Sequence, residues 1–417
     1  MPRTSPARPA LLRRLNDRTV LELLLADGPT SRGDLAARTG LSKPTVAEVV
    51  GRLEDAGLLI DAGETIGRPG PNGRLYDVDP ARSVGVGISV EPRGVRAELV
   101  DARGTVLAAA SDPQGAGGGP ASAIVTALVE SLAASSRVPV NAVHDVVIAV
   151  PGSYDASADQ VRHADRVPAW TAPGISASVT SALAASARLS IDNDANLALV
   201  AESAATHGDG ARNRSLLWLG AGVGLATEID GRLYRGTAGG AGEVGYVPVP
   251  ADPEHGVSQR QPEFQDLVGA TAVVRLAKQH GIAGRTAAEA VARAVTSTDA
   301  TATAFLDELA TRVALGLSIV VAVLDPGVVV LGGSTGRAGG PELARRTQRA
   351  LRTRSRLACA VVPGSVDGDP VLAGARLVAS RRARERLLTT TSIPQQADPG
   401  LHSVSSQPRT AEEASHR

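Results

Sequence analysis

Carboxylate and amide side chains that could bind a polyhydroxylated ligand follow an apolar run near the middle of the chain. The segment IDNDANLALVAE, residues 191–202, places Asn193 and Asp194 after a predicted strand and before a predicted helix. A carboxylate at such a junction can accept the proton of a sugar hydroxyl. Further on, AGGAGEVGY places Glu243 among glycines, where it could bind a pair of hydroxyls. Each signal is weak alone, because an Asn-Asp pair is more commonly a helix cap.

A glycine-rich turn lies between these two segments. LWLGAGVGLATEIDGRLYRG, which begins at Leu217, predicts a strand, a turn at residues 220–224 and a hairpin. The backbone N–H groups of such a turn can face a phosphate, although most glycine-rich hairpins are simply turns. The order and spacing of the three segments are therefore more informative than any one of them.

The elements around these segments predict an α/β domain. Strands and helices alternate after residue 83, and this alternation occurs twice along the chain, which favours two similar lobes. The first set has strands at 84–90, 95–100, 105–109 and 146–150 and a helix at 121–134. The second has strands at 216–219, 224–229, 232–234 and 328–331.

The N-terminal region has a different pattern, that of a winged helix-turn-helix. A helix is predicted at 16–26, a second opens at Ser31 with Asp34 as its capping-box partner, and a third opens at Ser42 with Pro44 in its first turn. Two short strands at 58–60 and 75–78, joined by a Gly/Pro-rich loop, form the wing. This domain is expected to be mostly α-helical with a small β wing.

The third helix has a buried face and an exposed face. Its apolar residues recur at helical spacing and are expected to be buried: Val46, Val49, Val50 and Leu53. The polar residues of its N-terminal half remain outside, where a recognition helix meets DNA: Ser42, Lys43, Thr45 and Glu48.

These outward side chains have chemistry suited to DNA. Lys43 and the helix N-terminus suit a phosphate, Ser42 and Thr45 suit phosphates or base edges, and Glu48 could accept from a cytosine amino group. In the wing, Arg68 and Arg74 could enter a minor groove or bind its phosphates. The alternative is a small helical bundle that uses the same amphipathic pattern for protein contacts.

The overall charge neither favours nor excludes a nucleic-acid partner. The 417 residues carry 43 basic and 43 acidic side chains, so any attraction to DNA must come from a local patch. Residues 1–45 provide one, because basic residues outnumber acidic residues there by about two to one.

Other features of the sequence indicate a cytoplasmic protein without membrane contact. The single cysteine, Cys359, rules out an internal disulfide and a multi-cysteine metal site and fits a reducing compartment. The N-terminus lacks the apolar core of a signal peptide. The most apolar stretch, residues 315–324, is too short to cross a membrane and is interpreted as a buried helix.

Together these patterns predict a multidomain chain. A disordered N-terminus spans residues 1–10, the winged helix-turn-helix spans 11–80, and a two-lobed sensor domain spans 84–388. Residues 389–417 are polar, rich in Pro, Ser and Thr, and expected to be disordered.

In their order and spacing, the segments resemble the ROK family, which comprises sugar-responsive repressors and bacterial sugar kinases on an actin/hexokinase-like fold. The resemblance extends from about residue 15 to about residue 388. It is carried by VGVGISVEPRGVRAELVDARGTVL, VVIAVPG, IDNDANLALVAE, LGAGVGLATEIDGRLYRG, GGAGEVGY and LDPGVVVLGG. It implies that Asn193, Asp194 and Glu243 occupy sugar-contacting positions, with Asp194 at the position of the kinases' catalytic base.

One departure from the family bears on kinase activity. Where the kinases carry an Asp and a Gly-Gly-Thr phosphate loop, this chain has GISVEPRG, which puts Gly87 at the place of the Asp. Phosphoryl transfer without the side chains that handle Mg-ATP loses its main electrostatic help. We therefore expect no kinase activity and no catalytic role for Asp194.

A second departure concerns the family's zinc motif. Tyr246 stands where the motif has a histidine, and VSQRQPEFQDLVG contains no cysteine, so no zinc and no other cofactor is expected. Two pocket positions also differ: Gln265 replaces a family Glu that contacts sugar, and Arg166 stands where an Asn is common.

Three hypotheses remain. The leading one is a repressor that binds a palindromic double-stranded DNA operator as a homodimer or higher homo-oligomer. It would release the operator when a sugar or phosphorylated sugar changes the angle between its lobes. The second is an active sugar kinase with a fused DNA-binding module, which Asp194 favours and Gly87 opposes. The third is a regulator whose pocket has lost its ligand and responds to a protein partner.

Overall fold

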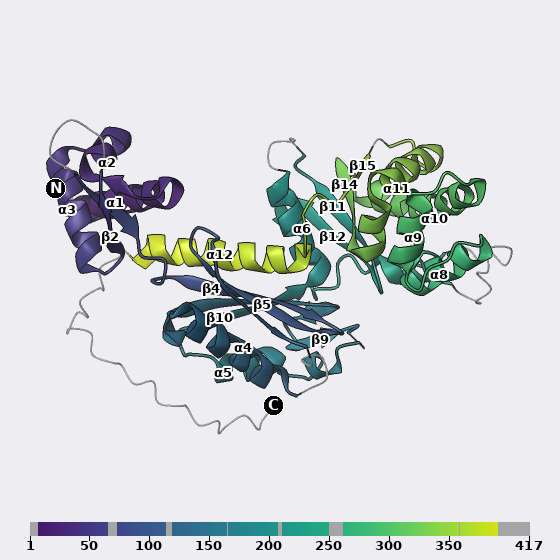
Figure 1. Cartoon of the computed structure of the whole chain (residues 1–417), viewed down its shortest axis with the longest axis horizontal. Coiled ribbons are helices and arrows are strands. Elements are labelled where there is room, and N and C mark those ends of the chain that lie inside the picture. The colour runs from purple at the N-terminus through teal and green to yellow at the C-terminus, as the bar shows by residue number, and fades with distance from the viewer. Residues whose placement is uncertain are drawn as a thin grey trace, which may run out of the picture.

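The computed structural model describes residues 7–65, 73–113, 119–164, 166–206, 211–249, 262–357 and 359–390. Figure 1 shows a small helical domain at the N-terminal end and two α/β lobes, with the last helix, α12 (Pro370–Thr390), running from the lobes to the small domain.

The small domain has the predicted winged helix-turn-helix architecture. The predicted capping box is confirmed: Ser31 Oγ accepts from the Asp34 N–H at 3.2 Å and donates to the Asp34 carboxylate at 2.8 Å. Gly40 ends that helix in the left-handed conformation, at φ 72°. The elements are α1 (Ala7–Asp27), β1 (Thr30–Ser31), α2 (Arg32–Thr39), α3 (Lys43–Asp55), β2 (Leu59–Glu64) and β3 (Arg74–Val78), with sheet order β1-β3-β2.

Two boundaries differ from the prediction. Helix α1 begins at Ala7, whereas the pattern predicts disorder up to residue 10 and a helix from residue 16. Apart from Pro9, which the first turn of a helix tolerates, its first turns consist of good helix formers. Their leucines are exposed and give no buried period to detect: Leu11 57%, Leu12 59% and Leu15 50%. At the other end, α12 continues to Thr390, past the predicted limit at 388.

The two lobes contain sheets with the same strand order, which confirms the prediction of two similar α/β units. In each sheet, taken in chain order, the strands lie 3-2-1-4-5, with the first three antiparallel and the last two joined in parallel. The first sheet consists of β4 (Val84–Glu91), β5 (Gly94–Asp101), β6 (Val106–Asp112), β7 (Val143–Val150) and β10 (Arg188–Asn193). The second consists of β11 (Arg214–Leu219), β12 (Val223–Ile229), β13 (Arg232–Leu233), β14 (Val328–Gly332) and β15 (Ala360–Pro363).

Helices cover both faces of these sheets, and each lobe has its own apolar core. The first lobe carries α4 (Ala121–Ser136), α5 (Ile175–Ala182), a small hairpin of β8 (Ser153–Asp155) and β9 (Gln160–Arg162), and the 3-10 turns η1 (Val140–Ala142) and η2 (Pro168–Trp170). The second carries α6 (Asp194–Ala205), η3 (Val244–Tyr246), α7 (Gln265–Val268), α8 (Ala270–Gln279), α9 (Ala287–Val295), α10 (Ala300–Leu324) and α11 (Gly333–Arg354).

Helix α12 is packed so closely that glycines are needed around it. A Cβ atom at Gly87 of β4 would lie 2.5 Å from the backbone nitrogen of Arg376 in α12. A Cβ atom at Gly374 of α12 would lie 1.8 Å from the carbonyl oxygen of Leu197 in α6. Both distances are far below van der Waals contact, so α12 is fixed between the first sheet and α6.

The C-terminal end of α12 belongs to the core of the DNA-binding domain. Ala383, Leu387 and Leu388 are buried in one cluster with apolar residues of α1 and α3. Ser83 Oγ, in the segment that leaves the wing, donates to the Ala383 carbonyl at 2.9 Å. The predicted domain limits at 80 and 84 therefore separate segments of sequence that share a core in space.

No helix in the described part of the chain is both long enough and apolar enough to cross a membrane. The stretch 315–324 is helical, as predicted, and forms the end of α10. It is not buried all round, because 76% of Val323 and 39% of Ile319 are exposed.

Candidate functional site

The N-terminal half of α3 presents the predicted polar face. Ser42 caps the helix, with its Oγ accepting from the Thr45 N–H at 3.3 Å, and the two hydroxyls are 2.8 Å apart. Lys43 and Glu48 are exposed, and neither has an ion pair or side-chain hydrogen bond within the described residues. The structure therefore places Ser42, Lys43, Thr45 and Glu48 along one end and side of one helix.

The opposite face of α3 fixes the helix to its domain. Its predicted apolar residues have at most 1% of their surface exposed: Val46, Val49, Val50 and Leu53. Arg52, one helical turn after Glu48, pairs with Asp17 of α1 at 2.5 Å. The helix that carries the candidate DNA contacts is therefore held by both apolar packing and an ion pair.

The wing arginines have different outcomes. Arg74 is 45% exposed, but its guanidinium pairs with Asp61 at 2.7 Å and with Glu54 at 2.9 Å. It also lies over the ring of Tyr76, 4.9 Å from the ring centre. A DNA contact by Arg74 would have to compete with two carboxylates. Arg68 lies outside the described residues.

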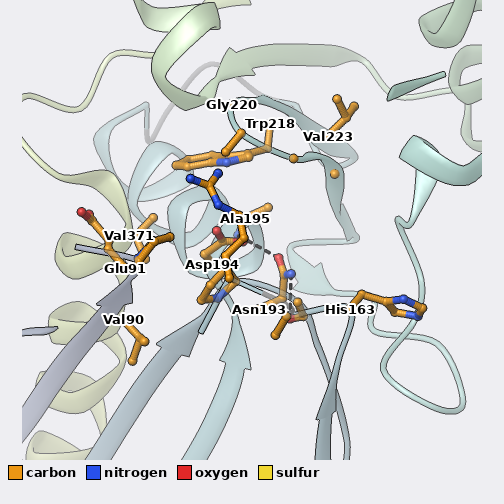
Figure 2. A pocket seen from close by; sticks show the side chains of 18 of the residues that line it. Val90, Glu91, His163, Asn193, Asp194, Ala195, Trp218, Gly220, Val223 and Val371 are labelled. Carbon is orange, nitrogen blue, oxygen red and sulfur yellow. Dashed lines mark hydrogen bonds between the residues drawn. The ribbon is translucent and has the colours of Figure 1, made fainter. Parts of the chain in front are cut away.

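A cavity of about 570 Å³ opens between the two lobes and contains the predicted ligand-binding residues. Figure 2 shows Trp218 and Gly220 on one side of this space and Asp194 and Asn193 on the other. The polar and aromatic side chains of the lining are Ser89, Glu91, Arg93, His163, Arg166, Asn193, Asp194, Trp218, Glu243, Tyr246, Gln265, Thr286, Ser334 and Asp369.

Asn193 has a structural role in this cavity. It caps α6: its Oδ1 accepts from the N–H groups of Ala195 at 2.8 Å and Asn196 at 3.3 Å. Its Nδ2 donates to the Gly152 carbonyl at 2.9 Å, which ties the cap to the neighbouring loop. The cap that the sequence left open as an alternative is thus present, and contact with a ligand stays a prediction.

Asp194 lies in the first turn of α6 and faces the cavity. Its Oδ1 accepts from the Ala195 N–H at 2.8 Å, which favours the ionised form. Burial outweighs this effect and, together with the negative charges of Glu243 and Asp369, raises the pKa of Asp194 to about 7. The carboxyl group is therefore poised to change charge near neutrality.

Glu243 lies in the same lining, immediately before η3. Burial raises the pKa of Glu243, while the nearby His163 and a hydrogen bond from Ser153 act in the opposite direction. The His163 ring packs against Tyr246 with ring centres 5.1 Å apart. Two carboxyl groups with raised pKa values thus face one cavity, an arrangement that suits hydrogen bonds to sugar hydroxyls.

We expect the variant Asp194→Asn to gain stability relative to the parent as the pH rises from 4 to 7. The pKa is about 7 in the folded chain and 3.8 ordinarily, so the native state binds more protons than the unfolded state in this window. The free energy of unfolding therefore falls with rising pH, by at most about 1.4 kcal/mol per pH unit from this group. Urea unfolding at pH 5 and pH 7 measures the difference.

The control for this experiment is Asp367→Asn, which alters an exposed carboxylate. Its effect on the free energy of unfolding should be the same at both pH values. A difference between Asp194→Asn and the parent that does not grow with pH would contradict the raised pKa.

Trp218 and Asp369 are cavity residues that the sequence analysis did not single out. Trp218 of β11 is in register with Gly224 and Gly332 on its two neighbouring strands, so no cross-strand side chain covers its indole. The two glycines were a sequence signal that the indole of Trp218 is left uncovered. Asp369 caps α12, with its Oδ1 accepting from the Val371 N–H at 3.0 Å, and an Asp-Pro pair before a helix is a recognisable N-terminus.

Position 87 does not line the cavity. The lining on β4 begins at Ser89, and Gly87 faces the backbone of α12. An Asp at this position would therefore collide with α12 in the present packing. The glycine at this position gives α12 the room that an Asp would occupy. The sequence alone did not indicate this packing role.

The residues present do not fit the family's zinc site. Within the described ranges, no three His, Cys, Asp or Glu side chains come together as metal ligands. Tyr246 lines the cavity at the position of the family histidine, and a phenol without cysteines does not match the donors that structural zinc uses. Part of the segment that would supply the cysteines, residues 250–261, lies outside the described ranges.

Comparison with protein families agrees with this two-part architecture. Residues 86–382 match the model described as ROK family, and residues 13–60 match the model described as winged helix-turn-helix DNA-binding. The first match covers well over half of the chain. The chain belongs to the ROK family.

Individual relatives of this ROK chain include a kinase and a repressor. It is 30% identical over 168 residues to a glucokinase from Halalkalibacterium halodurans, covering 36% of this chain and 49% of that protein. It is 23% identical over 246 residues to the xylose repressor of Bacillus subtilis, covering 57% of this chain and 61% of that protein. The matches thus span about half to three fifths of the length of these relatives.

The fold also matches a solved structure along almost its whole length. A ROK family transcriptional regulator, described as a homolog of the E. coli MLC protein, aligns with 91% of this chain and 99% of that one. The TM-score is 0.65 at 17% identity. At this identity, the likeness concerns the fold, and it includes both the N-terminal domain and the two lobes.

Proposed function

We propose that this ROK protein is a DNA-binding transcriptional regulator that represses carbohydrate-related genes in the cytoplasm. In this proposal it senses a sugar or sugar derivative in the interlobe cavity and does not phosphorylate it. The observation that carries the proposal is the packing of α12. Its capping residue Asp369 and Val371 line the cavity, and its far end lies in the core of the DNA-binding domain.

The DNA-binding half of the proposal rests on α3. Its exposed N-terminal end carries a lysine, two hydroxyls and a carboxylate in an arrangement suited to a major groove. A winged helix-turn-helix of this size reads one half-site, so we propose that a homodimer or higher homo-oligomer binds a palindromic operator.

The regulatory half follows from the two ends of α12. A ligand that binds between the lobes would favour one angle between them, and α12 would transmit this change to the DNA-binding domain. Arg103 of the first lobe supports the rigid connection, because it pairs with Asp77 of the wing and donates to the Leu24 carbonyl of α1 at 2.8 Å.

An active kinase is a second candidate, which Asp194 and the glucokinase relative favour. Position 87 argues against it, because the residue that would handle Mg-ATP is replaced by a glycine that faces α12. A regulator that has lost its ligand and responds to a protein partner is the third candidate. It is favoured by Arg166, Gln265 and Tyr246, which depart from the family pattern in the cavity lining.

Two experiments separate these candidates. Selection of bound DNA from a random pool tests the DNA-binding half, and the absence of any enriched motif would contradict it. A panel of sugars, assayed for a shift in melting temperature and for ATP-dependent phosphorylation, tests the sensor. A shift without turnover supports sensing, turnover supports the kinase, and silence in both assays supports the protein-responsive regulator.

We expect Lys43→Ala to weaken binding to all DNA sequences and to lower the magnitude of the salt dependence by about one counterion. The reason is that an exposed ammonium at the start of α3 neutralises one phosphate. The natural control is Lys278→Ala, which changes the other lysine of the chain, on α8, and should have no effect. Titrations of a selected site and a random site at several salt concentrations measure both quantities.

We expect Glu48→Ala to change which base is preferred at one position of each half-site, because its carboxylate can accept from a cytosine amino group. Repeating the DNA selection with this variant reveals the change. An unaltered motif would show that Glu48 does not read bases.

A further inference from the structure

The interlobe cavity extends beyond the residues assigned to sugar binding. Asp194 and Glu243 provide its polar side, and Trp218 lies across the space from Asp194 (Figure 2). Its volume of about 570 Å³ is in the range of pockets that enclose ligands of more than one ring. A single sugar ring hydrogen-bonded to Asp194 and Glu243 would leave the Trp218 side of the cavity unfilled.

Trp218 offers a preformed apolar surface on that side. Its neighbours across the sheet are both glycines, Gly224 and Gly332, and the indole is only half-buried. A Cβ atom at Gly220 would lie 3.1 Å from Trp218 Nε1, so the glycine in the turn after β11 leaves room for the indole. Flat indole faces pack well against the apolar C–H face of a sugar ring.

The acids of the lining favour an uncharged ligand. Glu91 and Asp369 both pair with Arg96, which offsets their charge. Burial raises the pKa values of Asp194 and Glu243, and the charge of Glu243 adds to the effect at Asp194. A phosphate beside these two groups would add a further negative charge, whereas neutral hydroxyl groups can form hydrogen bonds with them.

We propose that the effector is a neutral disaccharide, or the end of a longer oligosaccharide. One ring binds at Asp194 and Glu243, and the second ring packs against Trp218. This inference rests on the proposed sugar-sensing function and specifies its ligand class. It makes Trp218 a specificity-determining residue for chain length.

The tryptophan content of the chain provides a direct test. There are two tryptophans, Trp218 in the cavity and Trp170, which is fully buried in the first lobe. In a Trp170→Phe background, fluorescence reports on Trp218 alone. The probes are maltose, cellobiose, lactose and sucrose, each compared with its component monosaccharides and with glucose 6-phosphate. Melting shifts of the chain with native Trp170 provide a second readout that does not depend on the background substitution.

At least one disaccharide should change the emission of Trp218 and bind at least about tenfold more tightly than its component monosaccharides. Trp218→Ala should remove most of this advantage, and Trp218→Phe should restore part of it. The matched control is Tyr234→Ala, which removes an exposed aromatic of the second lobe that does not line the cavity. It should leave the advantage unchanged.

Three outcomes would overturn the inference. The first is that monosaccharides or glucose 6-phosphate bind as tightly as every disaccharide, which would overturn the ligand class and leave sugar sensing intact. The second is that Trp218→Ala lowers the affinity for disaccharides and for monosaccharides by the same factor. No binding of any probe in either readout would overturn the inference together with the proposed sensing, whereas the selected DNA motif would still test the DNA-binding function separately.

Discussion

Gly87→Asp, which restores the kinase residue at its position, is expected to destabilise the protein by about 3 kcal/mol or more and to produce no kinase activity. The new Cβ would lie 2.5 Å from the Arg376 nitrogen and 2.8 Å from the Ala375 carbonyl carbon of α12. Backbone atoms of a packed helix cannot move aside as a flexible side chain can. The substitution also buries a carboxylate against α12. Urea unfolding and an ATP-dependent sugar phosphorylation assay measure the two effects.

Two alanine variants separate the steric effect from that of the charge. Gly87→Ala adds only the Cβ and should also destabilise, but less than the Asp variant. Gly51→Ala, in α3, adds a Cβ with no neighbour within 4 Å and should stabilise by up to about 1 kcal/mol. A Gly87→Asp chain that is as stable as the parent and phosphorylates a sugar would contradict both the packing argument and the proposed lack of kinase activity.

The second large effect is expected at the junction between α12 and the DNA-binding domain. Leu387→Ala should cost about 2–5 kcal/mol, because Leu387 is 1% exposed in the core shared with α1 and α3. The loss should loosen the DNA-binding domain first. Calorimetry should show an earlier transition, and hydrogen exchange should become faster in α1 and α3 but not in β11 and β14.

Leu357→Ala is the matched control, since this leucine is 44% exposed outside that core. Its effect on the free energy of unfolding should stay within about 0.5 kcal/mol. If Leu387→Ala left the exchange of α1 and α3 unchanged, α12 would not be the connection between cavity and DNA-binding domain that the proposed function requires.

Much of the architecture was predictable because it is encoded by local signals. The cap pair Ser31 and Asp34 begins α2, the recurring valines of residues 46–50 define the buried face of α3, and alternating strands and helices predict two α/β lobes. Each signal depends on residues only a few positions apart. The turn between β10 and α6 was predictable for the same reason, and with it the joint position of Asn193 and Asp194.

Local signals also set limits on what could be predicted. The start of α1 was wrong by more than two turns, because exposed leucines give no buried period. The ion pairs of Arg74 with Asp61 and Glu54 could not be predicted, because these partners lie on other elements, and its contact with DNA stays a prediction. The pKa of Asp194 is likewise raised by burial and by two acids distant in sequence.

The sequence by itself determined the family, the winged helix-turn-helix and the repeated lobes. It also indicated that Asn193, Asp194 and Glu243 belong to one site. Only the tertiary structure decided that Trp218 faces Asp194, that Gly87 faces the backbone of α12, and that α12 joins the cavity to the DNA-binding domain. The physical reason is the range of the interactions. Caps and periodicity act within a helix or strand, whereas the contact of Ser83 with Ala383 joins residues 300 positions apart and exists only in the folded chain.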